Sequence, residues 1–128
     1  NLDLFAEMDS AAKLHKVFKG DPTVMDAETV IKMATIEGAN AIGLGEVVGS
    51  LEPGKQADII IIDTHKPHLT PMYHPESHVV YAVNGSDVSD VFVAGKMLMR
   101  NYVSANLDIN DIMRQAVSAG LAVQRNHQ

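Results

Sequence analysis

Four consecutive isoleucines, Ile59–Ile62, lie between two aspartates and constrain the fold more than any other feature of the chain. An unbroken β-branched run of this length is typical of a strand that is covered on both faces. Further along, Val88–Val93 and Lys96–Tyr102 alternate on either side of Ala94-Gly95. Glycine supplies the positive φ of a tight turn, so this pattern predicts a β-hairpin. The second half of the chain is therefore expected to contain a small sheet.

Helical spacing dominates the segments before and after this sheet. Apolar residues recur every three or four positions in Leu2–Phe18 and again in Asp26–Gly38, where the aspartate is a good N-cap. A shorter helical piece is predicted at Ala39–Leu44, between two glycines. A closing helix is predicted to begin at Asp108 or Asn110, since either side chain can cap it.

The connecting segments complete the predicted order of elements. Glu46–Leu51 and His78–Val83 are predicted to be short strands, Glu52–Lys55 a tight turn, and Thr64–Ser77 an irregular loop that contains three prolines. The polar tail Gln124–Gln128 is expected to fray. Helices first, then a small mixed or antiparallel sheet, then a closing helix is an α+β order and not a βαβ alternation.

Composition excludes several classes of function. The chain has 128 residues, which suits one domain, and a net charge of -6 with scattered basic residues, which argues against nucleic-acid binding. The longest apolar runs are far shorter than the roughly 20 residues that span a bilayer, so no membrane association is expected. The absence of cysteine excludes disulfides and thiolate chemistry and is compatible with the cytoplasm, where we expect the protein.

The chain offers one local cluster of potential metal ligands. It consists of His65, His68, His74 and His78. Their spacing matches no common zinc pattern, the intervening prolines make the segment irregular, and no cysteine joins them. A solvated or structurally bonded loop is therefore favoured over a metal site.

The acidic residues suggest structural roles. Asp58 and Asp63 flank the isoleucine run and are expected to end the strand or to bond neighbouring backbone groups. Asp87 and Asp90 are expected to shape the turn before the hairpin. The sequence supplies nothing that would raise the pKa of a carboxyl group, so no catalytic residue is assigned.

Four segments, taken in order, resemble the aminohydrolase/chlorohydrolase branch of the amidohydrolase superfamily, which includes adenosine-type and S-adenosylhomocysteine deaminases and triazine hydrolases. They read N-L-D-L-F-A-E-M at 1–8, A-T-I-E-G-A-N-A-I-G-L at 34–44, V-G-S-L-E-P-G-K-Q-A-D-I at 48–59, and H-V-V-Y-A at 78–82, which leads into G-S-D-V at 85–88 and V-A-G-K at 93–96. The third string is shared widely across the superfamily, whereas the first and fourth point to this branch.

The resemblance implies a (β/α)8 barrel and a small β-sandwich that is assembled from both ends of the family's chain. By that resemblance, residues 1–44 would be the terminal helices of the barrel. Residues 45–128 would be the C-terminal part of the sandwich with its closing helix.

The resemblance also implies a divalent metal, zinc or iron, in the complete enzyme. The family holds it with a His-x-His pair, two later histidines, and an aspartate that precedes the segment matching Asn1. None of those positions falls inside this sequence. We therefore expect no metal ligand, no cofactor and no catalytic residue in this chain, and no activity from it alone. The parent would be a hydrolytic deaminase or chlorohydrolase acting on an amino- or chloro-substituted heteroaromatic ring, a small-molecule substrate.

Two functional hypotheses follow. The chain opens at Asn1 without an initiator methionine and runs directly into an apolar-periodic segment, so we expect a truncated, processed or otherwise incomplete metallohydrolase. The alternative is a free-standing, non-catalytic module that self-associates and binds a partner. Faces of Leu2–Leu44 that would pack on barrel strands would then be exposed, so a homo-oligomer is expected.

Overall fold

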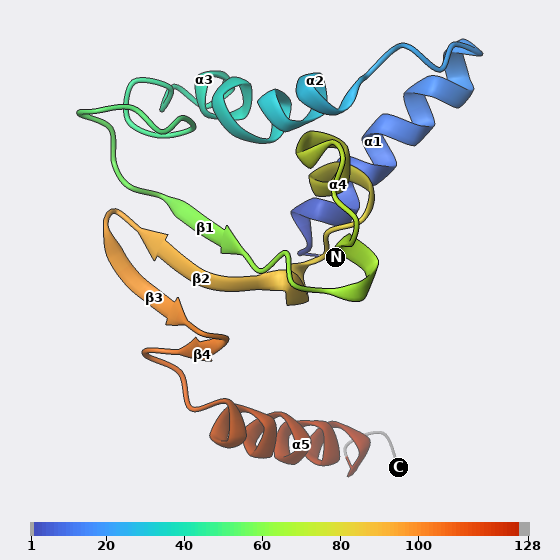
Figure 1. The fold of residues 1–128 in the computed structure, drawn as a ribbon. Helices are drawn as coiled ribbons and strands as arrows, with labels where there is room; N and C mark the ends of the chain where they lie inside the picture. The colour runs from blue at the N-terminus through green and yellow to red at the C-terminus, as the bar shows by residue number, and fades with distance from the viewer. Residues whose placement is uncertain (1, 126–128) are drawn as a thin grey trace.

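The computed structural model describes residues 2–125. Its elements are, in chain order, α1 (Leu4–Lys19), α2 (Ala27–Lys32), a π-helical turn η1 (Met33–Glu37), α3 (Gly38–Ala41), β1 (Ile59–Ile62), a 3-10 turn η2 (Pro67–Leu69), α4 (Pro75–Tyr81), a 3-10 turn η3 (Gly85–Asp87), β2 (Val88–Val93), β3 (Lys96–Arg100), β4 (Val103–Ser104) and α5 (Ile109–Arg125). The predicted order of helices, sheet and closing helix is confirmed, with one further helix, α4, between the strands (Figure 1).

The sheet has four antiparallel strands in the order β1-β2-β3-β4. Val93 pairs with Lys96, which leaves Ala94 and Gly95 as a two-residue loop with φ angles of 49° and 74°. Two successive positive φ angles are the geometry of a type I′ turn, which matches the twist of the flanking strands. The predicted hairpin is confirmed.

The prediction that the isoleucine strand is covered on both faces is wrong for this chain. β1 lies at the edge of the sheet and pairs with β2 alone. Ile60 and Ile61 remain 49% and 47% exposed. Because adjacent residues of a strand point to opposite faces, residues 2–125 leave both faces of β1 partly uncovered.

The caps of the first two helices act through neighbouring backbone. The carboxylate of Asp3 accepts from the Phe5 N–H at 3.0 Å, and that of Asp26 accepts from the Thr29 N–H at 2.8 Å. A predicted break at Gly38 is absent, because α2, η1 and α3 form one continuous helical segment. This segment ends at Ala41, earlier than the predicted Leu44.

Two predicted strands are not strands. Residues 46–51 form turns, in which the Val47 and Val48 N–H groups both donate to the Leu44 carbonyl at 2.9 Å. Residues 78–81 belong to α4, which begins with a proline in its first turn. Val80 is 1% exposed within the helical core, so tertiary packing overrides the strand preference of valine.

The core lies where α1, α2 and α4 meet. Its buried members are Met8, Ala12, Val30 and Val80, with partly buried apolar side chains around them. The hairpin lies outside this core. It is bonded to the segment before β1, because the Gly95 N–H donates to the Ala57 carbonyl at 3.0 Å.

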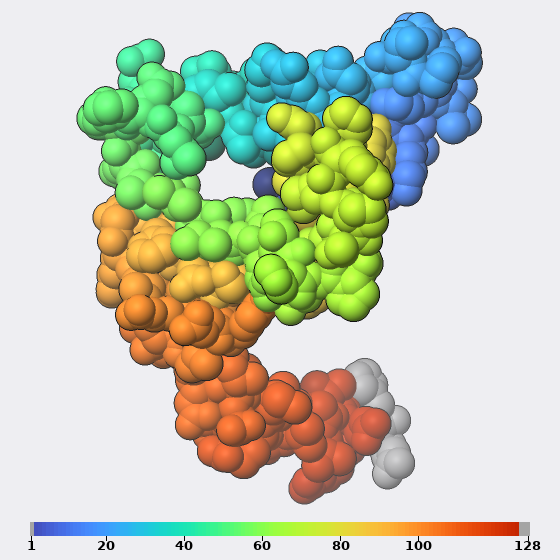
Figure 2. All heavy atoms as spheres, in the orientation of Figure 1, coloured from blue at the N-terminus to red at the C-terminus, as the bar shows by residue number. Residues whose placement is uncertain are grey.

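Helix α5 stands apart from this body (Figures 1 and 2), and it has no buried residue in the described part of the chain. Asp108 caps it, as predicted, by accepting from the Asp111 N–H at 3.0 Å. Of the tail predicted to fray, Gln124 and Arg125 are helical and residues 126–128 lie outside the described residues. No helix within residues 2–125 is long and apolar enough to cross a membrane.

Candidate functional site

The four histidines of the sequence cluster do not converge. His78 Nδ1 lies 3.0 Å from the His74 carbonyl oxygen, one helical turn away, and His68 Nε2 lies 2.9 Å from Asp87 Oδ2. His78 is on α4 and not on the short strand predicted for His78–Val83. Across residues 2–125, no three histidine or acidic side chains are grouped as metal ligands. The cluster therefore consists of separate local contacts.

Asp87 is a buried charged residue at the end of η3, directly before β2, and is 2% exposed. Its Oδ2 atom accepts from the Asn84 N–H at 3.0 Å and from His68 Nε2 at 2.9 Å. The first of these bonds belongs to a capping box, in which the Asn84 side chain accepts from the Ser86 N–H at 3.0 Å. The carboxylate thus joins two segments that are far apart in the sequence, η2 and η3.

Burial raises the pKa of Asp87. The hydrogen bonds from His68 and from the Asn84 backbone lower it by more than burial raises it, so the pKa lies below its ordinary value. A carboxyl group with this environment stays ionised and cannot act as a general acid near neutral pH. The sequence predicted that Asp87 shapes a turn. It carried no signal for the contact with His68, which lies 19 positions away.

A second polar cluster joins the end of β1 to the turn between β3 and β4. Asp63 accepts from the His65 N–H at 2.9 Å and from the Tyr102 hydroxyl at 2.8 Å, and these bonds hold its pKa below the ordinary value. Lys66 Nζ lies 3.4 Å from Asp63 Oδ2 and 4.9 Å from the centroid of the Tyr102 ring. At the other end of β1, Asp58 accepts from the Ala94 N–H at 2.6 Å. Both aspartates bond to neighbouring groups, as predicted.

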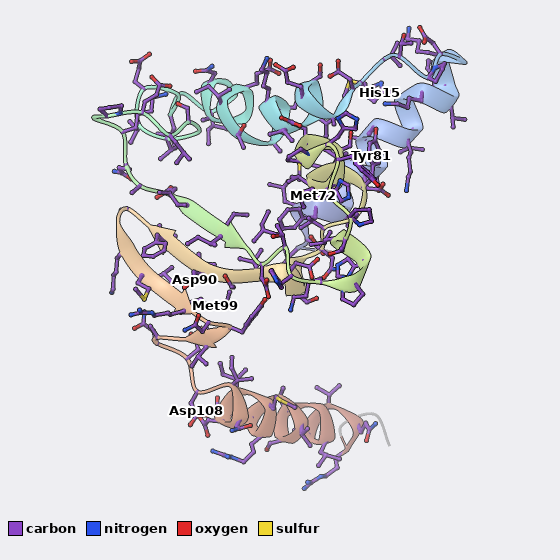
Figure 3. All side chains as sticks on the ribbon, in the orientation of Figure 1. His15, Met72, Tyr81, Asp90, Met99 and Asp108 are labelled. Carbon is purple, nitrogen blue, oxygen red and sulfur yellow. The ribbon has the colours of Figure 1, made fainter. Side chains whose placement is uncertain are left out.

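Other polar and sulfur-containing side chains are spread over the molecule (Figure 3): Asp90 and Met99 lie on the sheet, Asp108 at the start of α5, and His15 on α1. Lys16, next to His15, donates to the carbonyls of Val24 and Met25 at 2.8 and 2.6 Å. These contacts hold the loop between α1 and α2 and bring no second reactive group to the histidine.

The largest hollow beside β1, about 510 Å³, lies between the helical segment, residues 48–51 and the strand, where Figure 2 shows an opening. Its polar side chains are engaged: Thr35 donates to the Ile31 carbonyl at 2.7 Å, Ser50 accepts from Lys55 at 2.7 Å, and Asp58 accepts from the Ala94 N–H at 2.6 Å. A neighbouring hollow of about 270 Å³ lies between α1, α2 and β1 and is lined almost wholly by apolar side chains. Neither offers a free acid, base or nucleophile, so both are better suited to packing than to chemistry.

The chain exposes far more surface than a compact domain of its mass. Its accessible area is 9398 Å² at 13.8 kDa, against about 6,600 Å² expected for a folded monomer of that mass. Exposed apolar side chains contribute on α1 and α5, including Leu14, Val17, Phe18, Met113 and Val117. A surface of this kind is typical of a segment that packs against further protein.

Comparison with known proteins agrees with this geometry. The sequence model of the Amidohydrolase family matches residues 1–98. A 5-methylthioadenosine/S-adenosylhomocysteine deaminase of Syntrophus aciditrophicus (strain SB) is 54% identical over 115 residues, which are 90% of this chain and 26% of that protein. The chain therefore spans about a quarter of the length of this curated relative.

Solved structures are also similar to this fold. An adenosine deaminase from Xanthomonas campestris with bound zinc superimposes with a TM-score of 0.91 at 33% identity, covering 94% of this chain and 28% of that one. The atrazine chlorohydrolase from Arthrobacter aurescens TC1, complexed with zinc, superimposes with a TM-score of 0.79 at 22% identity. The match covers 89% of this chain and 25% of the chlorohydrolase chain, and at this identity it supports the fold alone. Because the Amidohydrolase family model matches most of this chain, the chain belongs to the amidohydrolase family.

Proposed function

We propose that this chain is the C-terminal part of a metal-dependent amidohydrolase that hydrolytically deaminates an adenosine-like nucleoside. The observation that supports this most strongly is the 54% identity over 115 residues to a 5-methylthioadenosine/S-adenosylhomocysteine deaminase. The chlorohydrolase activity considered from the sequence has weaker support, since that neighbour is only 22% identical. The chain's lack of cysteine is compatible with a cytoplasmic enzyme.

Hydrolytic deamination places water on the ring carbon that carries the amino group and releases ammonia, and a metal supplies the chemistry that makes this water nucleophilic. The residues of this chain do not fit such a metal. His68 is bonded to Asp87, His78 to the backbone of its own helix, and no third ligand lies near either of them among residues 2–125. In our proposal the ligands lie elsewhere in the complete enzyme, and the chain alone is inactive.

The proposed role of the chain is to support the catalytic part. Residues 1–44 would be the terminal helices of the barrel, and residues 45–128 the C-terminal part of the sandwich with its closing helix. The half-exposed isoleucines of β1 and the apolar hollows beside them support this division, because they would be covered by the rest of the enzyme.

A self-associating, non-catalytic module is the second candidate. The exposed apolar face of α5 favours it, since six large apolar side chains of that helix are 44% to 65% exposed. In this second proposal, the apolar face of α5 would be covered by another copy of the chain, and not by the catalytic part of a complete enzyme.

The two proposals are separated by a chimera. The matching 115 residues of the Syntrophus aciditrophicus deaminase are replaced by the corresponding residues of this chain. Ammonia release is then measured with 5-methylthioadenosine and S-adenosylhomocysteine, and chloride release with atrazine. We expect deaminase activity from the chimera on the two nucleosides and none from the isolated chain. A folded chimera without activity, or deamination by the chain alone, would contradict the first proposal.

A further inference from the structure

A chain of contacts connects the sheet to the first turn of α1. It begins at Asp87, whose carboxylate holds the turn Asn84–Asp87 through the Asn84 N–H at 3.0 Å. Within this turn, Gly85 faces the carboxylate of Asp3: a Cβ atom added to Gly85 would stand 3.7 Å from Asp3 Oδ2, which is van der Waals contact distance. That same carboxylate caps α1 by accepting from the Phe5 N–H at 3.0 Å and the Ala6 N–H at 3.5 Å.

The turn is itself fixed from two further directions. The Asp87 carbonyl accepts from the Asp63 N–H at 2.8 Å, which anchors the turn to the end of β1. His68 donates to the carboxylate at 2.9 Å from η2. Asp87 is 2% exposed, whereas the side chain of His68 is 45% exposed and can bind solvent once the carboxylate is removed. Loss of the carboxylate would break both of its hydrogen bonds at once and release the turn from η2.

We propose that Asp87 is a positioning residue, which holds the first turn of α1 in place through the turn Asn84–Asp87. The consequence for catalysis rests on the proposed function. In that proposal α1 is one of the terminal barrel helices, and its N-terminus marks the face at which (β/α)8 enzymes place their active sites. Asp87 would then affect the reaction by fixing the position of α1, without touching the substrate.

The direct test is amide hydrogen exchange on the full chain. Asp87→Ala is expected to raise the exchange rates of the Phe5 and Ala6 amides about tenfold while the amides of α2 change little. The control Asp26→Ala removes the cap of α2 and is expected to raise exchange at Thr29 while leaving Phe5 and Ala6 unchanged. Unchanged exchange at Phe5 and Ala6, or an equal rise at every amide, would overturn the proposal.

A second pair of variants covers the case in which Asp87→Ala does not fold. Asp87→Asn keeps an oxygen at the acceptor position and is expected to retain most of the protection. Gly85→Asp leaves Asp87 in place and brings a second carboxylate beside that of Asp3, and the repulsion between like charges is expected to raise exchange at the same two amides. Protection that survives Gly85→Asp would overturn the proposed contact between the turn and the helix.

The catalytic consequence is measured in the chimera. There Asp87→Ala is expected to lower kcat about tenfold with little change in KM, since a small misplacement of a catalytic face costs rate before it costs binding. Asp87→Asn is expected to restore most of kcat. Unchanged kcat in a folded Asp87→Ala chimera would overturn the link to catalysis. An inactive chimera that carries Asp87 would instead overturn the proposed function, and hydrogen exchange alone would then decide on the positioning role.

Discussion

At the scale of single residues, the most consequential group is the buried carboxylate of Asp87. Burial alone would favour its neutral form, and the hydrogen bonds from His68 and Asn84 reverse that preference. Its pKa is lowered on folding, so the charged form stabilises the fold. This contribution is present above the ordinary pKa of an aspartate and is lost as the pH falls through the lower pKa of the folded state.

The pH dependence of stability should report this charge. Asp87→Asn keeps one acceptor oxygen but exchanges charge-assisted hydrogen bonds for neutral ones, a loss of about 1 kcal/mol. We expect its melting temperature to lie about 4 °C below that of the unchanged chain at pH 6. The gap should shrink as the pH falls below about 4, because the unfolded state takes up the proton there first and the folded state follows at its lower pKa.

Thermal unfolding of the two proteins between neutral and acidic pH measures this gap. Other carboxylates with lowered pKa values, such as Asp63, are present in both proteins and cancel in the comparison. A His68→Leu variant, which removes one donor, should show a weaker pH dependence. A gap of equal size at low and neutral pH would contradict the account.

A hydrogen bond could be predicted from the sequence only when its two partners lie a few residues apart in the chain. The caps Asp26 and Asp108 were predicted correctly, because each bonds an N–H three residues away and the local sequence contains both partners. The pairing of His68 with Asp87 could not be predicted, because it forms only when η2 and η3 are brought together by the sheet. The candidate site therefore had no local signature.

At the scale of elements, local turn chemistry was predictable and the choice between helix and strand was not always so. The hairpin at Ala94-Gly95 was predicted from its alternation and its turn residues. Helix α4 was mistaken for a strand because His78–Val83 is rich in valine, and its burial against α1 and α2 decides otherwise. The segment 46–51 was mistaken for a strand because its fold is set by close packing on the helical segment.

Gly49 is where that packing is closest. A Cβ atom added to it would stand 2.8 Å from the Ala39 Cβ and 2.9 Å from the Ile36 Cα, whereas one added to Gly54 would meet nothing within 4 Å. Both glycines have nearly the same φ, 96° and 97°. The two sites therefore share a conformational cost and differ in steric cost.

Alanine substitution at these two glycines separates the costs. Gly54→Ala should lower the free energy of unfolding by about 1 kcal/mol, the cost of positive φ alone. Gly49→Ala should lower it by about 1–3 kcal/mol more, because the neighbouring helix must shift. Urea denaturation of both variants measures the difference, and equal losses would mean that the close approach at residue 49 is unimportant.

At the scale of the whole molecule, the chain does not bury all of its apolar surface. The core residues gather around α1, α2 and α4, while β1 is half exposed and α5 is uncovered in the described residues. The sequence predicted the orphaned helical faces through the family resemblance. It did not predict the separation of α5, which depends on the length and path of the segment after β4.

The isolated chain is expected to self-associate through these surfaces. Light scattering coupled to size-exclusion chromatography should find a metal-free dimer or larger oligomer. Val117→Glu, which places a charge on the apolar face of α5, should shift the population toward monomer, while Ser118→Glu on the neighbouring polar face should not. A monomer that holds stoichiometric zinc would contradict this expectation and would return attention to the histidine cluster.

The central claim is that this chain serves a nucleoside deaminase whose catalytic residues lie outside it. The kcat/KM of the chimera for 5-methylthioadenosine tests that claim most directly. The account predicts a value within about tenfold of the parent deaminase, together with no ammonia release by the chain alone. A folded chimera that releases no ammonia, or a chain that deaminates the nucleoside by itself, would contradict it.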